Sequence, residues 1–367
     1  MKILLLSCST GEGHNHCALA VKEALDARGH ETSFLDMLHM FGAPGPLSFD
    51  KILNRISTKA PDVFGVMYHA GAMYSATGVT SPVYMANIRH ARQLNTFIRD
   101  NGYDAVVCSH LFPMETLTFL RRWERCDVKC YGILSDYTCI PFLAEPDLDA
   151  YFLPHSEVRE LCIQAGMPAE KLIVTGMPVA ARFLAPMDKA AARAVLGLPA
   201  DKKIYLIMTG GIGCGDAVTL CEAIRRVPDE DALLCVLPGR NEELRTTLEE
   251  KYAGHGVLAV PFTDQVPAYM HAADVLLSKA GGISSAEAAV LGVPLVHTMA
   301  IPGVETQNAA FFAAHGMSFF AQNPDEAARF ADRLIFDAKT RKRMLAAQNA
   351  ELPKDAAARI AASLEHS

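Results

Sequence analysis

The sequence has no apolar run approaching the roughly 18 to 20 residues that a helix needs to cross a bilayer. Its first six residues, Met1 to Leu6, are apolar apart from Lys2, but polar residues from Ser7 onward cut this run short. We therefore expect a buried first strand at this position rather than a signal peptide.

The ten cysteines include no Cys-x-x-Cys pair. The nearest two, Cys126 and Cys130, have no accompanying His or Cys residues that would complete a zinc site. The expectation is reduced, mostly buried thiols in the cytosol, with no bound metal.

The sequence has no excess of positive charge, since 34 Lys and Arg stand against 41 Asp and Glu, for a net charge of -7. This balance argues against a nucleic-acid-binding protein, although local basic patches can still contact an anionic membrane. A hydrophobic content of 50% with 20% charged residues is typical of a soluble globular enzyme and not of a disordered chain. The length of 367 residues predicts two domains.

Short, continuous apolar runs alternate with helical patterns along the whole chain. Such runs predict parallel strands in sheets that helices cover on both faces. The fold class is therefore α/β, with two Rossmann-like doubly wound domains, residues 1–185 and 186–367, that face each other across a cleft at the carboxyl ends of their strands. The last helix is expected to pack back on the first domain. The predicted strands are residues 3–6, 104–108, 129–134, 150–153, 172–175, 204–208, 233–236, 257–260, 275–277 and 294–297.

A segment at about residues 41–99 breaks this rhythm, because it is rich in Met, aromatic residues, Lys and Arg. Helices of this composition can lie on a membrane surface or hold an apolar substrate. The alternative is a helical insert whose apolar face joins the core.

Three glycine-rich turns follow predicted strands, at residues 10–14, 209–215 and 278–287. In the last, a strand gives way to small residues and then to a helix, whose first N–H groups and dipole suit a diphosphate. An ordinary strand-to-helix turn is the alternative. His14 lies at the mouth of the first sheet, where a histidine can take a proton from an attacking hydroxyl. A structural, hydrogen-bonded His14 is equally compatible with the sequence.

Four ordered blocks carry a resemblance to a known family: Gly-Glu-Gly-His at 11–14, and residues 235–244, 262–266 and 278–287. They resemble the monogalactosyldiacylglycerol synthases and the bacterial processive diacylglycerol glucosyltransferases, which are related to the enzyme that adds N-acetylglucosamine to lipid I. The resemblance runs from residue 1 to about residue 335. It implies a GT-B fold, a UDP-sugar held mainly by the second domain and a lipid acceptor held mainly by the first.

The resemblance also implies roles for single residues. Glu287 is expected to accept hydrogen bonds from the two ribose hydroxyls. The alternative is that it is only a glutamate in the first turn of a helix, where the helix dipole stabilises its charge. The segment 302–308 matches a loop over the donor sugar, with Val304 where the family has Gln, which leaves the identity of the sugar open. Phe262 is either at the uracil edge or in the core. The donor-binding set is Gly210, Gly211, Gly213, Arg240, Asn241, Phe262, Thr263, Gly281, Gly282, Ile283, Ser284, Ser285, Glu287, Glu305, Gln307 and Asn308.

The remaining assignments lie in the first domain. His14 is the expected base, and Asp136 is expected to orient it. His110 positions the acceptor or a phosphate, or is structural. The acceptor-side set is Gly11, Gly13, His110 and Tyr137.

The expected activity is inverting transfer of a hexose from UDP-glucose or UDP-galactose to diacylglycerol or a glycosyldiacylglycerol, on the inner face of the cell membrane. Fixed dipoles at the glycine turn would stabilise the leaving diphosphate, so no metal and no cofactor are expected. Three alternatives remain: an N-acetylglucosamine transferase acting on a polyprenyl-linked cell-wall precursor, a UDP-sugar epimerase, and a non-catalytic UDP-sugar sensor.

Overall fold

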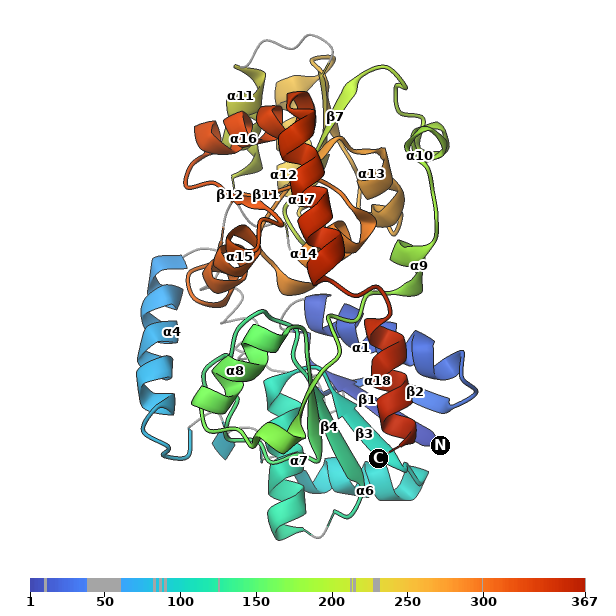
Figure 1. The fold of residues 1–367 in the computed structure, drawn as a ribbon, viewed down its shortest axis with the longest axis vertical. Helices are drawn as coiled ribbons and strands as arrows, with labels where there is room; N and C mark the ends of the chain where they lie inside the picture. Colours follow the sequence, from blue (N-terminus) through green and yellow to red (C-terminus); the bar gives the residue numbers. More distant parts are fainter. Residues whose placement is uncertain are drawn as a thin grey trace. The chain divides into compact units, whose positions relative to one another are not determined.

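The computed structural model describes residues 1–9, 12–37, 61–81, 84–85, 88, 91–124, 126–211, 213, 216–226, 232–298 and 300–366. The chain forms two compact units (Figure 1). The first unit comprises Met1–Ala181, Pro302–Val304 and Pro353–Ser367, and the second comprises Arg182–Ile301 and Glu305–Leu352.

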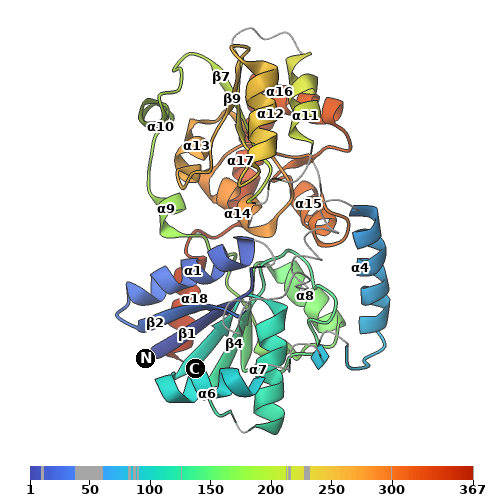
Figure 2. The same cartoon turned by 180° about the vertical axis from the view of Figure 1, so that it is seen from behind.

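The first unit is built on a parallel six-stranded sheet with the order β2-β1-β3-β4-β5-β6. Helices α1 and α18 cover one face, and α6 and α7 cover the other (Figures 1 and 2). The strands are β1 (Lys2–Ser7), β2 (Glu31–Asp36), β3 (Ala105–Cys108), β4 (Lys129–Ile133), β5 (Ala150–Leu153) and β6 (Leu172–Val174). The α-helices are α1 (Glu12–Asp26), α4 (Pro61–Ser75), α6 (Ala91–Asn101), α7 (Leu111–Trp123), α8 (Ser156–Gln164) and α18 (Ala356–Glu365). A 3-10 turn, η2 (Ala169–Lys171), precedes β6.

The second unit repeats this plan with a parallel six-stranded sheet of order β12-β11-β10-β7-β8-β9. Helix α16 packs on β10 and β11 and contacts both α11 and α17, and α10 lies beside α13 (Figure 2). The strands are β7 (Lys203–Met208), β8 (Ala232–Leu237), β9 (Val257–Ala259), β10 (Val275–Ser278), β11 (Leu295–His297) and β12 (Phe319–Phe320). The helices are α9 (Ala181–Leu184), α10 (Lys189–Leu196), α11 (Ala217–Arg225), α12 (Glu242–Tyr252), α13 (Val266–Ala272), α14 (Gly282–Leu291), α15 (Val304–Ala314), α16 (Pro324–Phe336) and α17 (Ala338–Glu351).

Each sheet has a point at which the direction of strand addition reverses. The chain adds β2 on one side of β1 and β3 on the other, and it adds β8 and β10 on opposite sides of β7. Ligands of open α/β sheets bind outside the carboxyl ends of the strands at such a point. The α/β fold class and the two parallel sheets predicted from the sequence are confirmed.

All of the predicted strands form, but two strands were not predicted. Strand β2 has the mixed sequence Glu-Thr-Ser-Phe-Leu-Asp and lies at a sheet edge, and Asp36 is the one buried residue among its six. Strand β12 is two half-buried residues at the edge of the other sheet. Edge strands are covered less completely than central ones, so they lack the continuous apolar run on which the prediction depended.

At the amino ends of the strands in each sheet, an aspartate that precedes one strand bonds to the neighbouring strand. Asp149 Oδ2 accepts a hydrogen bond of 2.8 Å from the N–H of Cys130, and Asp274 Oδ2 accepts one of 2.8 Å from the N–H of Ile204. Asp274 also pairs with the buried Arg193 guanidinium at 2.8 Å. These bonds satisfy a backbone N–H near the start of an interior strand and fix the register of that strand against its neighbour.

The C-terminal helix α18 belongs to the first unit, where it packs against α1 (Figure 1). Glu365 near its end binds the Arg28 guanidinium at 2.9 Å and His30 Nε2 at 2.9 Å. Of the segment at about 41–99, residues up to 60 lie outside the described residues, as do 82–83, 86–87 and 89–90, whereas α4 is described. Within the described part of the chain, no helix is long and apolar enough to cross a membrane.

Candidate active site

His14 lies in the first turn of α1, directly after β1 and beside the point where the order of the first sheet reverses. Its Nδ1 is 3.0 Å from the carbonyl oxygen of Ser109, which follows β3, and 2.9 Å from Ser135 Oγ, which follows β4. Three neighbouring strands therefore position this one imidazole.

The contact with Ser109 decides which nitrogen of His14 carries the proton. A carbonyl oxygen only accepts, so Nδ1–H must donate to it, and the lone pair of the neutral ring is then on Nε2. The Ser135 hydroxyl has a second, long contact of 3.5 Å to Asp136 Oδ2. This tautomer is the one that a base acting through Nε2 requires.

Burial lowers the pKa of His14 below its ordinary value of 6.5, while the charge of Asp136 and the hydrogen bond to Ser109 oppose this shift. The imidazole is therefore neutral at pH 7. Asp136 had been expected to orient His14. In the structure the two polar contacts of Nδ1 are with the carbonyl oxygen of Ser109 and the hydroxyl of Ser135, and Asp136 acts on the ring through its charge.

His110 packs edge-on against His14, with ring centroids 4.6 Å apart. Its Nδ1 accepts a hydrogen bond of 3.1 Å from the N–H of Phe112, so it caps the start of α7. Burial, and secondarily the neighbouring His14, hold its pKa well below 6.5. His110 thus has the structural role that the sequence left open.

The other acceptor-side candidates lie around His14. Gly13 precedes it in the first turn of α1, and Tyr137 is a buried residue two positions after Ser135. Burial and the charge of Asp136 raise the pKa of Tyr137 well above its ordinary range. Gly11 lies outside the described residues.

The predicted diphosphate turn of the second unit links β10 to α14 through Gly281, which is the N-cap residue. Gly282 and Ile283 are buried in the first turn, and Ser284 Oγ donates to the Gly281 carbonyl at 3.2 Å. The N-terminus of a ten-residue helix therefore lies at the carboxyl end of strand β10.

Ser285 is engaged inside the unit. Its hydroxyl is 2.9 Å from His297 Nε2, its N–H donates to Gly281 O at 3.0 Å, and His297 Nδ1 is 3.1 Å from Ser318 Oγ. Burial lowers the pKa of His297 to about 3, so the ring is neutral and joins two hydroxyls. Ser285, one of the two serines expected at the diphosphate, thus anchors α14 to the core through its hydroxyl.

The two turns after β7 and β8 are packed backbone to backbone. Gly213 has φ +74°, and a Cβ there would lie 2.3 Å from the carbonyl oxygen of Pro238. Asn241 donates from Nδ2 to Gly213 O at 3.0 Å and accepts from the N–H of Leu244 at 2.9 Å, which caps α12. The predicted donor residue Asn241 is thus bound on both ends of its amide, while Gly210 and Gly211 lie in the same packed turn.

Arg240 and Phe262 form one surface in the second unit. The Arg240 guanidinium lies 4.4 Å from the centroid of the Phe262 ring, a cation–π distance. Phe262 is 55% exposed, so the alternative that placed it in the core is wrong. Thr263 next to it accepts a hydrogen bond of 3.1 Å from the N–H of Gln265. A flat, exposed cation and ring suit the stacking of a planar base.

Glu287 is only 4% exposed, and burial raises the pKa of its carboxyl to about 8, while Arg182 lowers it. The carboxyl is therefore largely protonated at pH 7. A ligand that donates two hydroxyls would favour the ionised form.

The residues of the predicted sugar loop separate into two groups. Gln307 is exposed on α15, whereas Asn308 is buried and donates from Nδ2 to Ala280 O at 3.2 Å. Glu305 is 6% exposed, forms an ion pair with Lys279 and accepts from the N–H of Ile301 at 3.0 Å. Lys279 is not among the residues predicted from the sequence. The feature that could have identified it is its position as a single cation within a run of small residues.

Comparison with known families bears on the two units separately. Residues 14–179 match the family described as monogalactosyldiacylglycerol (MGDG) synthase, and residues 214–359 match the glycosyltransferase family 28 C-terminal domain. A processive diacylglycerol beta-glucosyltransferase of Bacillus mycoides is 26% identical over 342 residues, which cover 92% of this chain and 86% of that protein. That of Bacillus pumilus is 24% identical over 341 residues, covering 92% and 87%.

The chain is a glycosyltransferase, and it is similar to these enzymes over most of its length. Solved structures support the GT-B fold: Acinetobacter baumannii MurG has a TM-score of 0.64 at 14% identity, covering 100% of this chain and 99% of that one. A structure of S. aureus MnaA with UDP has a TM-score of 0.65 at 15% identity, covering 100% and 96%.

Two Asp-x-Asp segments occur in this glycosyltransferase, a spacing that can place two carboxylates on one cation. In the first, Asp147 pairs with Lys171 at 2.6 Å and Asp149 pairs with Arg121 at 2.7 Å, so each carboxylate already has a cation. The second, at 229–231, lies outside the described residues.

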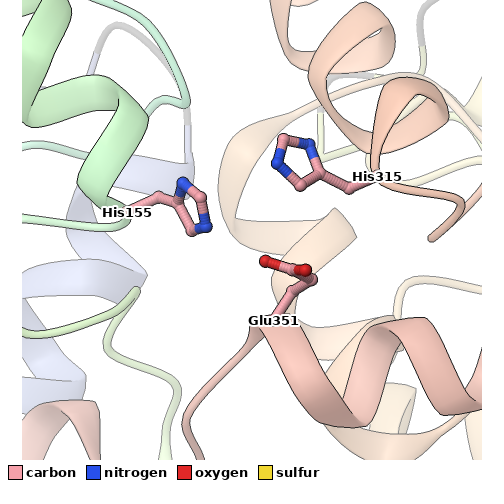
Figure 3. Close-up of side chains that lie close together, drawn as sticks. All are labelled: His155, His315 and Glu351. Carbon is pink, nitrogen blue, oxygen red and sulfur yellow. The ribbon is translucent and has the colours of Figure 1, made fainter.

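Figure 3 shows two histidines and a glutamate, residue types whose side chains can bind a metal ion. In the first unit, His155 Nδ1 accepts from the N–H of Glu157 at 3.2 Å and caps α8. In the second, His315 Nδ1–H donates to Phe311 O at 2.9 Å, and Glu351 ends α17. Both histidines have a structural role within their own unit, and we assign none of the three residues to a metal site.

Proposed function

We propose that this glycosyltransferase moves a hexose from a UDP-sugar to diacylglycerol, or to a glycosyldiacylglycerol, with inversion at the anomeric carbon. The observation that carries the proposal is His14, a neutral imidazole whose Nδ1–H is fixed on Ser109 and whose lone pair is on Nε2. In the proposed step, Nε2 takes the proton of the acceptor hydroxyl as its oxygen bonds to the anomeric carbon. The bond to UDP breaks, and its electron pair goes to the diphosphate oxygen.

The second unit is proposed to bind the UDP-sugar. Support comes from the N-terminus of α14 behind Gly281, from the exposed Arg240 and Phe262 pair, and from the buried Glu287 carboxyl as the ribose ligand. A structure of Anabaena HepE, which shares this fold at 15% identity, contains UDP-glucose. We propose that the reaction needs no divalent metal, because the positive end of the α14 dipole and the ammonium of Lys279 both lie at this turn.

The acceptor is proposed to be reached at a membrane surface, on the cytoplasmic side, through α4. Exposed apolar residues recur on this helix at one-face spacing, and two of them, Val66 and Met73, are 70% and 77% exposed. A soluble protein gains nothing from such a stripe in water, whereas the headgroup region of a bilayer buries it. The stripe is Val63, Val66, Met67, Met73 and Tyr74.

The reaction is tested with His14→Ala, UDP-glucose or UDP-galactose, and diacylglycerol in mixed micelles. UDP release and glycolipid formation are expected to fall roughly 10²- to 10⁴-fold, the usual contribution of a general base. His255→Ala, an exposed histidine of the second unit, is the matched control. Wild-type turnover by His14→Ala would remove the base assignment, and an α-linked product would remove inversion.

The same assay separates the alternatives. Turnover that survives EDTA is expected, and a strict need for a divalent ion would contradict the metal-free proposal. Transfer of N-acetylglucosamine to a polyprenyl-linked acceptor, or conversion of UDP-N-acetylglucosamine to an epimer without acceptor, would each replace the proposed activity.

Membrane contact is tested by sedimentation with vesicles of anionic phospholipid and diacylglycerol. Met73→Glu is expected to weaken binding several-fold, because it places a charge in the apolar stripe. Met187→Glu, at a methionine that is 40% exposed in the second unit, should bind like the wild type. Equal binding of both variants would exclude α4 as the contact.

A further inference from the structure

Lys279 lies where the order of the second sheet reverses. It follows β10, and its side chain passes over Gly210, which follows the neighbouring strand β7. A Cβ on Gly210 would lie 2.6 Å from Lys279 Cε, and a Cβ on Gly281 would lie 3.9 Å from its Nζ. The ammonium is therefore beside both glycine turns, at the place where ligands of open α/β sheets bind.

This position is electrostatically unfavourable for an isolated cation. The N-terminus of α14 begins at Gly281 and carries partial positive charge, which repels an ammonium close to it. Glu305 offsets this repulsion, because its buried carboxylate pairs with Lys279 Nζ. The N–H of Ile301 binds the other carboxylate oxygen at 3.0 Å and holds the glutamate in place.

We propose that Lys279 is a catalytic residue that stabilises the negative charge on the departing diphosphate, and that Glu305 is its positioning residue. The inference rests on the proposed transfer from a UDP-sugar. Lys279 adds a full positive charge to the partial charge of the helix dipole. Glu305 then has a role other than contact with the hydroxyls of the sugar.

The reason for a rate effect is the charge change of the reaction. When the anomeric C–O bond breaks, its electron pair stays on the diphosphate oxygen, and the diphosphate gains one negative charge. Lys279 therefore interacts more strongly with the transition state and with UDP than with the intact UDP-sugar. Only an interaction that strengthens in this way raises kcat. A full charge held in place before the reaction requires no reorganisation at the moment of bond breaking.

The first experiment replaces Lys279 by Met, which keeps the approximate length of the side chain and removes its charge. We expect kcat to fall about 10²- to 10³-fold, the usual cost of removing one preorganised group. The Kd of UDP should rise more than the Kd of the UDP-sugar, both measured by calorimetry without acceptor. Lys279→Arg keeps the charge and should recover at least a tenth of the activity. Lys251→Met, which removes an exposed cation paired with Glu222, is the control and should be fully active.

The second experiment tests the positioning role with Glu305→Gln, which keeps the hydrogen bond from Ile301 but removes the carboxylate charge. We expect a smaller fall in kcat, with the ratio of kcat/KM for UDP-glucose and UDP-galactose unchanged. A changed sugar preference with normal affinity for UDP would show that Glu305 contacts the sugar, and it would overturn the positioning role.

These outcomes separate the inference from the proposed function. If the wild type transfers a hexose and Lys279→Met keeps its kcat, or loses affinity for UDP and UDP-sugar equally, Lys279 is not catalytic. If the wild type transfers no hexose, the proposed function fails, and the two Kd values still decide the charge assignment. Thermal unfolding of each variant identifies any that fails to fold, and Lys279→Gln, which also removes the charge, then replaces Lys279→Met in the comparison of UDP with UDP-sugar.

Discussion

Replacing Glu287 by Gln is expected to stabilise the folded protein at alkaline pH and to change little at acidic pH. The carboxyl is 4% exposed, and burial raises its pKa from 4.5 to about 8. Between these two values the unfolded chain has released the proton while the folded chain keeps it. The unfolded state then binds fewer protons, so the stability of the wild type falls as pH rises through this window. The amide of Gln stays neutral throughout.

The magnitude follows from the two pKa values. Each pH unit inside the window costs the wild type about 1.4 kcal/mol, so from about pH 5.5 to about pH 8 the loss is roughly 3 kcal/mol. Any hydrogen bond that the amide makes differently from the carboxyl adds an offset that is the same at both pH values. We therefore compare the stability difference between wild type and Glu287→Gln at about pH 8 with the same difference at about pH 5.5. The change between the two isolates the ionisation of Glu287.

The assay is urea denaturation followed by far-ultraviolet circular dichroism, for wild type and Glu287→Gln at both pH values. Glu249→Gln, at an exposed glutamate paired with Arg245, is the control and should follow the wild type. A gain in relative stability of Glu287→Gln below about 1 kcal/mol, or a gain at the acidic pH instead, would refute the reasoning. Calorimetry in two buffers extends it: if the ribose requires the carboxylate, UDP binding at pH 7 releases a proton in the wild type and none in Glu287→Gln.

Three further outcomes follow from the structure. Asp136→Asn removes the charge that raises the pKa of His14, so the acid limb of the kcat/KM profile against pH should move to lower pH, and an unmoved limb would separate the two residues. Asp274→Asn breaks the pair with the buried Arg193 and should cost on the order of 3 kcal/mol in urea denaturation, where a loss under about 1 kcal/mol would contradict the pairing. His297 stays neutral down to about pH 3, so stability is lost as pH falls below 6.5, by about 1.4 kcal/mol per unit, and His297→Gln should lack this slope in the same assay.

The fold was predictable because central parallel strands must be apolar on both faces, and a run such as Leu4-Leu5-Leu6 has no other good explanation. The edge strands β2 and β12 were not, since one face or one side of each is not covered. The position of the candidate site at the carboxyl ends of the strands also follows from the sequence, because glycine turns and polar residues follow the predicted strands. What the sequence does not contain is the direction of each polar side chain.

That direction decides which residues can touch a ligand. His14 is oriented by a backbone carbonyl, and a carbonyl is present at every residue, so no sequence pattern marks Ser109 as its partner. Lys279 is similar, because its importance comes from Gly210, which lies far away in the sequence and next to it across the sheet. Contacts between neighbouring strand ends are set by the strand order, and the strand order is not local information.

Neighbouring polar residues in the motifs illustrate the consequence. In the pair Arg240-Asn241, the guanidinium lies on the exposed Phe262 ring while the asparagine amide joins two turns. In the pair Gln307-Asn308, the glutamine is exposed while the buried asparagine holds Ala280 in the predicted diphosphate turn. Loss of activity on replacing an inward asparagine therefore reports a displaced turn, together with lower stability. Only a loss at an outward residue, with stability unchanged, identifies a group that binds the donor.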